Sequence, residues 1–426
     1  MKQNLILVFF LCISLITYAQ EFTPNYNEAK IPDFTLAALL ESTQGKKITS
    51  TDDWESIRRP EILEIFKGEV YGNIPDAKVK TSYKSLESST EAIDGKAIRK
   101  QVRITFKRKG KSAFMDLLIY LPKQVGKPVP IFVGPNFYGN HAIENDPEIL
   151  LSNSWMRNNE GMGITDHKAT EKSRGYNSHR WPVSYIIENG FGVATYYYGD
   201  IDPDFDDGFK NGIHALFNNK KNNDVPKADA WGSIAAWAWG LSRAMDYFET
   251  DSAIDEARVA VLGHSRLGKA ALCAAAYDER FALVISNESG CGGAALSKRA
   301  YGETVGRINR VFPHWFCDNY NKYNENEAAL PIDQHGLLAL VAPRPLYVAS
   351  AEEDQWADPK GEFLSLKTAS IVYELYGLEN LIAAKMPPVD QPLIQGHTGY
   401  HIRTGKHNVL KYDWEQFVKF AEMHLE

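Results

Sequence analysis

Short apolar runs alternate with longer amphipathic segments over the second half of this chain. The expected strands are 192–198, 259–262, 281–286 and 346–350, which are apolar and bounded by turn residues. The expected helices are 231–248, 267–277, 359–376 and 410–424. Strands that alternate with helices of this length are joined by right-handed crossovers, which predicts a mostly parallel sheet with helices on both faces.

A hairpin is predicted before these elements. Residues 102–106 and 114–121 are apolar or alternating, and a turn at 109–111 joins them. Another buried strand is expected at 129–133. A hairpin followed by alternating strands and helices is typical of the α/β-hydrolase fold, a three-layer αβα sandwich. We expect one such domain in residues 20–426.

Two long segments lack these patterns. Residues 20–95 are polar and interrupted by prolines, so we expect an irregular N-terminal wrap around the body and not a separate domain. Residues 138–181 are polar and rich in glycine turns. Long excursions of this kind in compact domains are usually functional or disordered, and we expect this one to form part of the rim of the substrate cleft.

The first residues have the three parts of a secretory signal, with Lys2, an apolar run at 5–16, and Ala19 before a cleavage site. We expect removal of residues 1–19 and a secreted or periplasmic monomer. No other stretch approaches the ~20 apolar residues of a membrane helix. The net charge of −7 provides no basic surface for nucleic acid or an anionic membrane.

The chain offers no convincing metal motif, and we expect no metal and no organic cofactor. After signal removal, Cys273, Cys291 and Cys317 remain, without metal-ligand spacing. Their odd number permits at most one disulfide, and a Cys291 to Cys317 pair stays open. Residues 202–208 resemble a calcium loop, but the glycine comes one place late and Ile213 replaces the glutamate, so a surface loop is expected.

A nucleophile motif stands at 259–269, where an apolar run ends at a serine and a helical segment follows. Gly263 permits a tight turn before Ser265, but Leu267 stands where a second glycine is usual and Gly268 follows it. Such a turn raises the serine hydroxyl above the sheet edge, next to free N–H groups of the helix. The alternative is a structural joint in which the serine only caps the helix.

A serine hydroxyl becomes a nucleophile when a base takes its proton and an anion orients that base. In this layout the base precedes the last helix, where His397, His401 and His407 compete. We prefer His407, which stands directly before that helix. The other two are expected to be histidines of a loop or strand that hydrogen bonds satisfy.

Two carboxylates are candidates for the acid. Glu288 and Asp354 follow consecutive predicted strands, whose ends converge at one sheet edge, so either could reach the base. Arg266, directly after the serine, could donate a charge-assisted hydrogen bond to a developing oxyanion. Lys269 adds a second cation, which suggests an oxygen-rich substrate. The alternatives are solvated carboxylates and surface ion pairs.

Several motifs stand in a recognisable order along residues 100–426. They are 263–269, 288–293 with 302–304, 312–316, 354–359 and 405–407. Together they resemble the bacterial glucuronoyl esterases, a carbohydrate esterase family of 4-O-methyl-glucuronoyl methylesterases. The resemblance implies hydrolysis of the ester between glucuronic acid of xylan and lignin alcohols, with glucuronoxylan or a lignin-carbohydrate ester as substrate. One departure is His264, where the fungal members carry a disulfide cysteine.

The resemblance also implies a role for each matching residue. Ser265 is the expected nucleophile, His407 the base and Arg266 the oxyanion donor. Glu288 matches the usual acid, and Asp354 matches a second carboxylate of many bacterial members. The expected sugar contacts are Lys269, Glu303 and Trp356.

Two other functions fit the same residues. One is an acetyl-xylan or other carbohydrate deacetylase, in which the sugar is the alcohol of the ester. The other is an inactive glycan-binding protein that retains the fold. Trp181, Trp315 and Trp356 could stack on sugar rings in either case, although burial is the commoner role of tryptophan.

Overall fold

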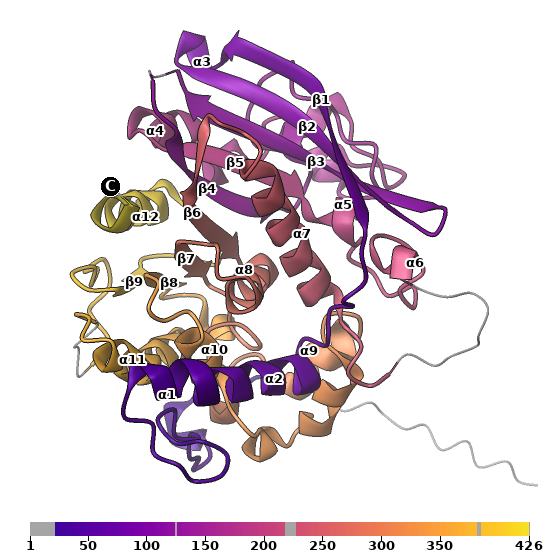
Figure 1. The fold of residues 1–426 in the computed structure, drawn as a ribbon. Helices are drawn as coiled ribbons and strands as arrows, with labels where there is room; N and C mark the ends of the chain where they lie inside the picture. The colour runs from indigo at the N-terminus through magenta and orange to yellow at the C-terminus, as the bar shows by residue number, and fades with distance from the viewer. Residues whose placement is uncertain (1–21, 124–125, 218–226, 381–384, 426) are drawn as a thin grey trace, which may run out of the picture.

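The computed structural model describes residues 22–123, 126–217, 227–380 and 385–425. The predicted secretion signal at 1–19 lies outside these residues. None of the described helices is both long and apolar enough to cross a membrane. One nine-stranded sheet runs through the described part of the chain, with helices packed against it (Figure 1).

The sheet has the strand order β1-β2-β3-β5-β4-β6-β7-β8-β9. Its strands are β1 (Lys80–Glu91), β2 (Ala97–Arg108), β3 (Lys111–Pro122), β4 (Val129–Asn136), β5 (Gly192–Tyr197), β6 (Ile254–His264), β7 (Leu283–Asn287), β8 (Leu346–Ala351) and β9 (Thr398–Arg403). The pairs from β1 to β5 are antiparallel, and those from β5 through β4 to β9 are parallel. The predicted hairpin, β2 with β3, and the mostly parallel sheet are both confirmed.

Several of the described helices cover the two faces of the sheet, and others lie in the connecting segments. The described helices are α1 (Thr51–Asp53), α2 (Arg59–Glu69), α3 (Ala92–Gly95), α4 (Val183–Glu188), α5 (Tyr198–Ile201), α6 (His214–Phe217), α7 (Ser233–Phe248), α8 (Arg266–Tyr277), α9 (Val305–Val311), α10 (Gln334–Ala339), α11 (Pro359–Leu375) and α12 (Lys411–Leu425). Val259 and Val261 of β6 join a core with α2, α7, α8, α10 and α11. Ala260 and Leu262 join a second core with α4 and α12. This alternation produces the predicted three-layer sandwich.

The N-terminal region is more regular than predicted. Because α2 and β1 lie inside residues 20–95, the expectation of an irregular wrap is wrong for both elements. Pro60 stands in the first turn of α2, where proline is tolerated, and Ile62 and Phe66 of this helix are fully buried. β1 is a polar edge strand with mostly exposed side chains, so it lacks the apolar alternation that reveals a strand.

β9 was not predicted as a strand, and it pairs in parallel with β8. It contains Gly399, where a Cβ would lie 2.5 Å from the ring of Tyr347. The glycine therefore permits a close approach inside the sheet and does not mark a loop. β9 carries His401 and Arg403 into the interior, just before the loop that leads to α12.

Candidate active site

Ser265 occupies a strained turn between β6 and α8, with φ of 57° and ψ of −129°. β6 ends at the residue before it and α8 begins at the residue after it. A Cβ on Gly263 would lie 1.9 Å from the carbonyl oxygen of Leu267, and one on Gly268 would lie 2.9 Å from Cβ of Ser289. Both glycines are needed for the close approach of chain segments, and the strand, turn and helix follow in the predicted order.

His407 stands in the loop between β9 and α12. Its Nδ1 lies 2.6 Å from Oδ2 of Asp354 and 3.0 Å from Oε2 of Glu288. The histidine side chain is 41% exposed, whereas those of Glu288 and Asp354 are 0% and 5% exposed. Burial lowers the pKa of His407, but hydrogen bonds and charges of both carboxylates outweigh this effect and raise the pKa to about 9. Both candidate acids therefore meet at one nitrogen of the predicted base.

Glu288 directly follows β7 and is held from two further directions. Its Oε1 accepts a hydrogen bond from Nη2 of Arg403 at 2.6 Å, and its Oε2 accepts one from the backbone N–H of Asn408 at 3.0 Å. Burial raises the pKa of Glu288 to about 7, although His407 and Arg403 act in the opposite direction. Asp354, which follows β8, makes the shorter contact with His407.

Arg403 is a buried positioning residue that the sequence did not reveal. Besides the Glu288 carboxylate, its guanidinium contacts the Asp413 carboxylate, 2.9 Å from Nε to Oδ2. It also donates to the carbonyl oxygens of Thr404, Lys406 and Asn408 at 3.1, 3.0 and 2.7 Å. The Arg403 side chain therefore links the loop that carries His407 to the carboxylate of Glu288. No sequence signal marked it, because residues 398–402, which precede it, include polar residues and a glycine and form no apolar run.

The two other candidate histidines are placed elsewhere. His401 is fully buried, with Nε2 2.8 Å from Oδ1 of Asp413 and Nδ1 2.9 Å from the hydroxyl of Tyr347. The ring of His397 packs near that of His424, with centroids 4.9 Å apart. Neither lines the cavity beside Ser265.

Arg266 lies among aromatic rings, with Cζ 4.7 Å from the ring centroid of Trp315 and 5.4 Å from that of Phe312. Its Nη1 donates to Oδ2 of Asp204, and its Nε is buried without a partner among the described residues. The other oxygen of Asp204 accepts from Nε1 of Trp315 at 2.8 Å and lies 2.9 Å from Nε2 of His314. Burial favours the protonated carboxyl, but these donors and Arg266 hold the pKa of Asp204 below its usual range.

The expectation of a surface loop at 202–208 is therefore wrong for two of its residues. Asp202 and Asp204 are 3% and 2% exposed. Asp202 accepts a hydrogen bond from the hydroxyl of Ser233 at 2.5 Å. The carboxylates of this segment accept hydrogen bonds from buried donors. The composition of the segment alone does not distinguish this role from contact with solvent.

A cavity of about 490 Å³ joins these groups. Among its lining residues are all the predicted site residues, namely Ser265, Arg266, Lys269, Glu288, Glu303, Asp354, Trp356 and His407. Lys269 is buried, and its Nζ donates to the carbonyl oxygen of Ser289 at 2.6 Å and lies 4.0 Å from Oε2 of Glu303. Trp356 is 36% exposed at the mouth.

Residues 138–181 contribute no side chain to this cavity among the described residues, so the prediction that they form its rim is wrong for the cavity itself. The apolar side chains of Ile143, Ile149 and Ile164 are buried in the two cores. Trp181 is also buried, with its ring centroid 5.9 Å from that of Trp414, whereas Trp315 does line the cavity.

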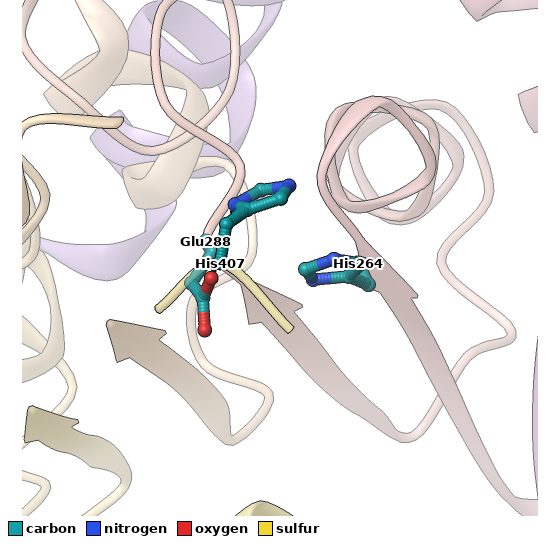
Figure 2. A group of neighbouring side chains, drawn as sticks. All are labelled: His264, Glu288 and His407. Atoms are coloured by element: carbon teal, nitrogen blue, oxygen red, sulfur yellow. Dashed lines mark ion pairs between the residues drawn. The ribbon is translucent and has the colours of Figure 1, made fainter. Parts of the chain in front are cut away.

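Three potential metal ligands gather at the ends of β6 and β7 and in the loop before α12 (Figure 2). Ligand atoms of His264, Glu288 and His407 lie within 4.8 Å of one another. Nδ1 of His264 is 2.6 Å from Oδ1 of Asn287, while both Glu288 oxygens and Nδ1 of His407 have the partners described above. Burial, followed by the charge of His407, holds the pKa of His264 well below its usual value. We therefore assign the cluster to a hydrogen-bond network.

The cysteines form no disulfide in the described part of the chain. Cys273, Cys291 and Cys317 are all free thiols and all buried. Burial raises the pKa of the Cys291 thiol well above its usual value, as expected for an unreactive thiol. The pairing of Cys291 with Cys317 that the sequence left open is therefore not made.

Comparisons with known proteins agree on one family. The family model "Glucuronyl esterase, fungi" matches residues 183–377. A carbohydrate esterase of an unknown prokaryotic organism is 51% identical over 408 residues, covering 96% of this chain and 94% of the relative. The 4-O-methyl-glucuronoyl methylesterase 1 of Wolfiporia cocos is 35% identical over 215 residues, covering 46% of this chain and 51% of the relative.

Solved structures give the same result over nearly the whole chain. A promiscuous CE15 esterase from a marine bacterial metagenome is 50% identical with a TM-score of 0.88, covering 94% of this chain and 100% of that one. A glucuronoyl esterase from Solibacter usitatus is 48% identical with a TM-score of 0.88, covering 93% of this chain and 100% of that one.

Proposed function

Because this chain belongs to carbohydrate esterase family 15, the glucuronoyl esterases, we propose that it hydrolyses the ester between 4-O-methyl-glucuronic acid of glucuronoxylan and lignin alcohols. One observation carries the proposal. His407 binds two buried carboxylates through Nδ1 and lines the same cavity as Ser265. A ring held in this way presents Nε2 as the nitrogen that accepts a proton.

The reaction starts when the Ser265 hydroxyl attacks the carbonyl carbon of the uronic ester. His407 takes the serine proton, and the carbonyl oxygen becomes a tetrahedral oxyanion. When the oxyanion collapses, the bond to the alcohol breaks and the alcohol leaves with that proton. A water molecule, deprotonated by His407, then attacks the acyl carbon. The bond between that carbon and Oγ of Ser265 breaks, His407 returns the proton to Oγ, and the uronic acid is released as glucuronate. Glu288 and Asp354 stabilise the imidazolium that forms in each step.

Arg266 serves as the side-chain donor to the oxyanion. Asp204 and the surrounding rings hold its guanidinium at the cavity wall, and its Nε keeps a free N–H within the described structure. The carbonyl oxygen of the ester is neutral before the attack and carries a negative charge after it. A preorganised cation therefore stabilises the transition state more than the ground state, which is what raises kcat.

Lys269, Glu303 and Trp356 contact the uronic sugar, since they line the cavity beside the reacting groups. The mature protein, residues 20–426, is a single catalytic domain that acts as a monomer outside the cytoplasm, where its polymeric substrate is found. Residues 1–19 are the export signal in this proposal, with cleavage after Ala19.

Hydrolysis of benzyl glucuronate by wild type and by Ser265→Ala tests this function. We expect the substitution to abolish turnover, whereas Ser85→Ala, on the exposed edge strand, leaves it unchanged. Ordinary turnover by Ser265→Ala would rule out the mechanism. A preference for acetylated xylan over the uronic ester would favour a deacetylase. Failure of a phosphonate probe to label Ser265 would favour a protein that only binds glycans.

A further inference from the structure

We infer that the N-terminal segment 22–28 completes a second sugar-binding subsite at the cavity mouth. This subsite, the outer wall, consists of Phe22, Arg307 and Trp356. It binds the sugar residue that carries the uronic acid. The inference rests on the proposed function, because it takes the uronic ester to be bound beside Ser265.

The three side chains of the outer wall come from distant parts of the chain and meet at one place. The rings of Phe22 and Trp356 are edge to face, with centroids 6.0 Å apart and an interplanar angle of 85°. Cζ of Arg307 lies 5.3 Å from the ring centroid of Phe22. Arg307 and Trp356 both line the cavity. The first described residue of the chain therefore supports a wall of the substrate pocket.

Arg307 differs from Arg299 and Arg310 because no carboxylate lies within ion-pair distance of it in the described part of the chain, and the charge of Glu303 acts on it from farther away. Arg299 pairs with Glu28 and Asp358, and Arg310 pairs with Glu325. Arg307 makes no ion pair in the described part of the chain, and its Nε is buried there without a hydrogen-bond partner. A half-buried guanidinium on a cavity wall, oriented by an aromatic ring, has N–H donors available for a ligand rich in oxygen.

Segment 22–28, which carries Phe22, is held against the body of the protein by several contacts. The Asn25 carbonyl oxygen accepts from the backbone N–H of Gly302 at 2.9 Å, and the Tyr26 carbonyl oxygen accepts from the hydroxyl of Tyr301 at 3.2 Å. The Glu28 carboxylate contacts Arg299 at 2.6 Å and Lys360 at 2.5 Å. These contacts join the segment to the turn before Glu303 and to the start of α11.

The contact between Asn25 and Gly302 also affects the predicted sugar contacts Glu303 and Trp356. Gly302 has φ of +63°, and a Cβ there would lie 2.5 Å from the carbonyl oxygen of Trp356. The next residue, Glu303, donates its backbone N–H to that oxygen at 3.0 Å. The segment that holds Phe22 thus also holds the turn that carries Glu303 against Trp356. Loss of the segment would disturb binding on the sugar side of the ester.

The chemistry of the outer wall identifies its ligand as a pyranose. Aromatic rings contact the apolar C–H face of a sugar, and a guanidinium donates to its hydroxyls. The outer wall continues from Glu303 and Trp356, whereas the rings of Phe312 and Trp315 surround Arg266 at the reacting end. An extension of the substrate beyond the uronic sugar, and not the alcohol, therefore reaches Arg307, against which Phe22 packs.

The test compares two benzyl esters, one of a free glucuronic acid and one in which that acid is attached to a xylo-oligosaccharide. For Phe22→Ala and Arg307→Gln, we expect kcat/KM on the oligosaccharide to fall at least tenfold more than on the monosaccharide ester, through KM. Arg307→Lys, which keeps the charge without the planar fork, should recover part of the loss. Arg310→Gln, at an exposed ion pair one helical turn away, is the matched control and should change neither value.

Equal losses on both esters would overturn the inference, because they would indicate a structural role. Losses in kcat/KM that differ between the benzyl ester and the methyl ester would also overturn the inference, since they would place the alcohol at the outer wall. Wild type that hydrolyses neither ester would refute the proposed function itself. Normal wild-type turnover with unaffected variants would refute only the subsite.

Discussion

Arg403 and Glu288 form a buried ion pair, 2.6 Å from Nη2 to Oε1, with side chains 2% and 0% exposed. The same arginine binds Asp413 and three carbonyl oxygens of the loop around His407. Glu288 and the loop that carries His407 are therefore held by the same cation. The position of the imidazole depends on a residue that does not itself line the cavity.

Replacing this arginine tests that dependence. Arg403→Met leaves Glu288 and Asp413 buried without their cation, so we expect the free energy of unfolding to fall by about 3–5 kcal/mol. Arg403→Lys keeps the charge but cannot reach every partner, and we expect a smaller loss of stability with a lower kcat. Thermal and urea unfolding measure the first effect, and ester hydrolysis measures the second.

Arg310→Met is the control for this pair of variants. Arg310 is exposed and pairs with exposed Glu325, so its removal should change stability by less than about 1 kcal/mol. Arg403→Lys with wild-type kcat would show that Arg403 stabilises the fold without positioning His407.

The two carboxylates at His407 support each other. Asp354 has the shorter contact to Nδ1, and Glu288 has other donors, so Asp354→Asn should lower kcat more than Glu288→Gln. Since either anion can orient the ring, we expect each single loss to be moderate and the double loss to approach about 10⁴-fold. Steady-state kinetics of the three variants measure this. A double loss no larger than one of the single losses would show that only one carboxylate acts.

The gathering of the proposed catalytic residues was predictable because consecutive parallel strands end at the same sheet edge. Ser265, Glu288 and Asp354 directly follow or nearly follow β6, β7 and β8, and His407 precedes the last helix. Order along the chain and turn residues were enough to bring these residues together. The choice between Glu288 and Asp354 was not predictable, since both reach the same nitrogen.

The residues that support the site were not predictable from local pattern. Arg403 ends β9, whose sequence is not an apolar run, and Asp204 lies in a polar loop. Either residue would look the same in a sequence if it were exposed. Their function depends on partners far along the chain, such as Glu288 and Arg266, which only tertiary packing brings close. The edge strand β1 is mostly exposed, so its polar residues do not alternate with apolar ones and the pattern typical of a strand is missing.

The pH dependence of hydrolysis should be set by His407. Its pKa is raised from the ordinary value of 6.5 to about 9, and it must be neutral to accept the serine proton. We therefore expect kcat/KM to increase as the pH rises toward about 9. In Asp354→Asn one of the anions that favour the imidazolium is gone, so the increase should occur at lower pH. A pH profile whose rising limb stays in place in Asp354→Asn would contradict this assignment.

Asp204 should act on the reaction through Arg266. Arg266→Ala removes the proposed oxyanion donor, and we expect kcat to fall by about a hundredfold or more. Asp204→Asn keeps the shape of the side chain but loses the charge that holds the guanidinium, so we expect a smaller decrease of roughly tenfold in kcat with little change in KM.

The double variant distinguishes positioning of Arg266 by Asp204 from an independent role of Asp204. If Asp204 acts only by positioning Arg266, then Asp204→Asn combined with Arg266→Ala should be no slower than Arg266→Ala alone. Asp206→Asn, an exposed change in the same loop, is the control and should leave kcat unchanged. Multiplicative losses in the double variant would mean that Asp204 contributes by another route. Effects confined to KM would move Arg266 from oxyanion stabilisation to ground-state binding of the uronic ester.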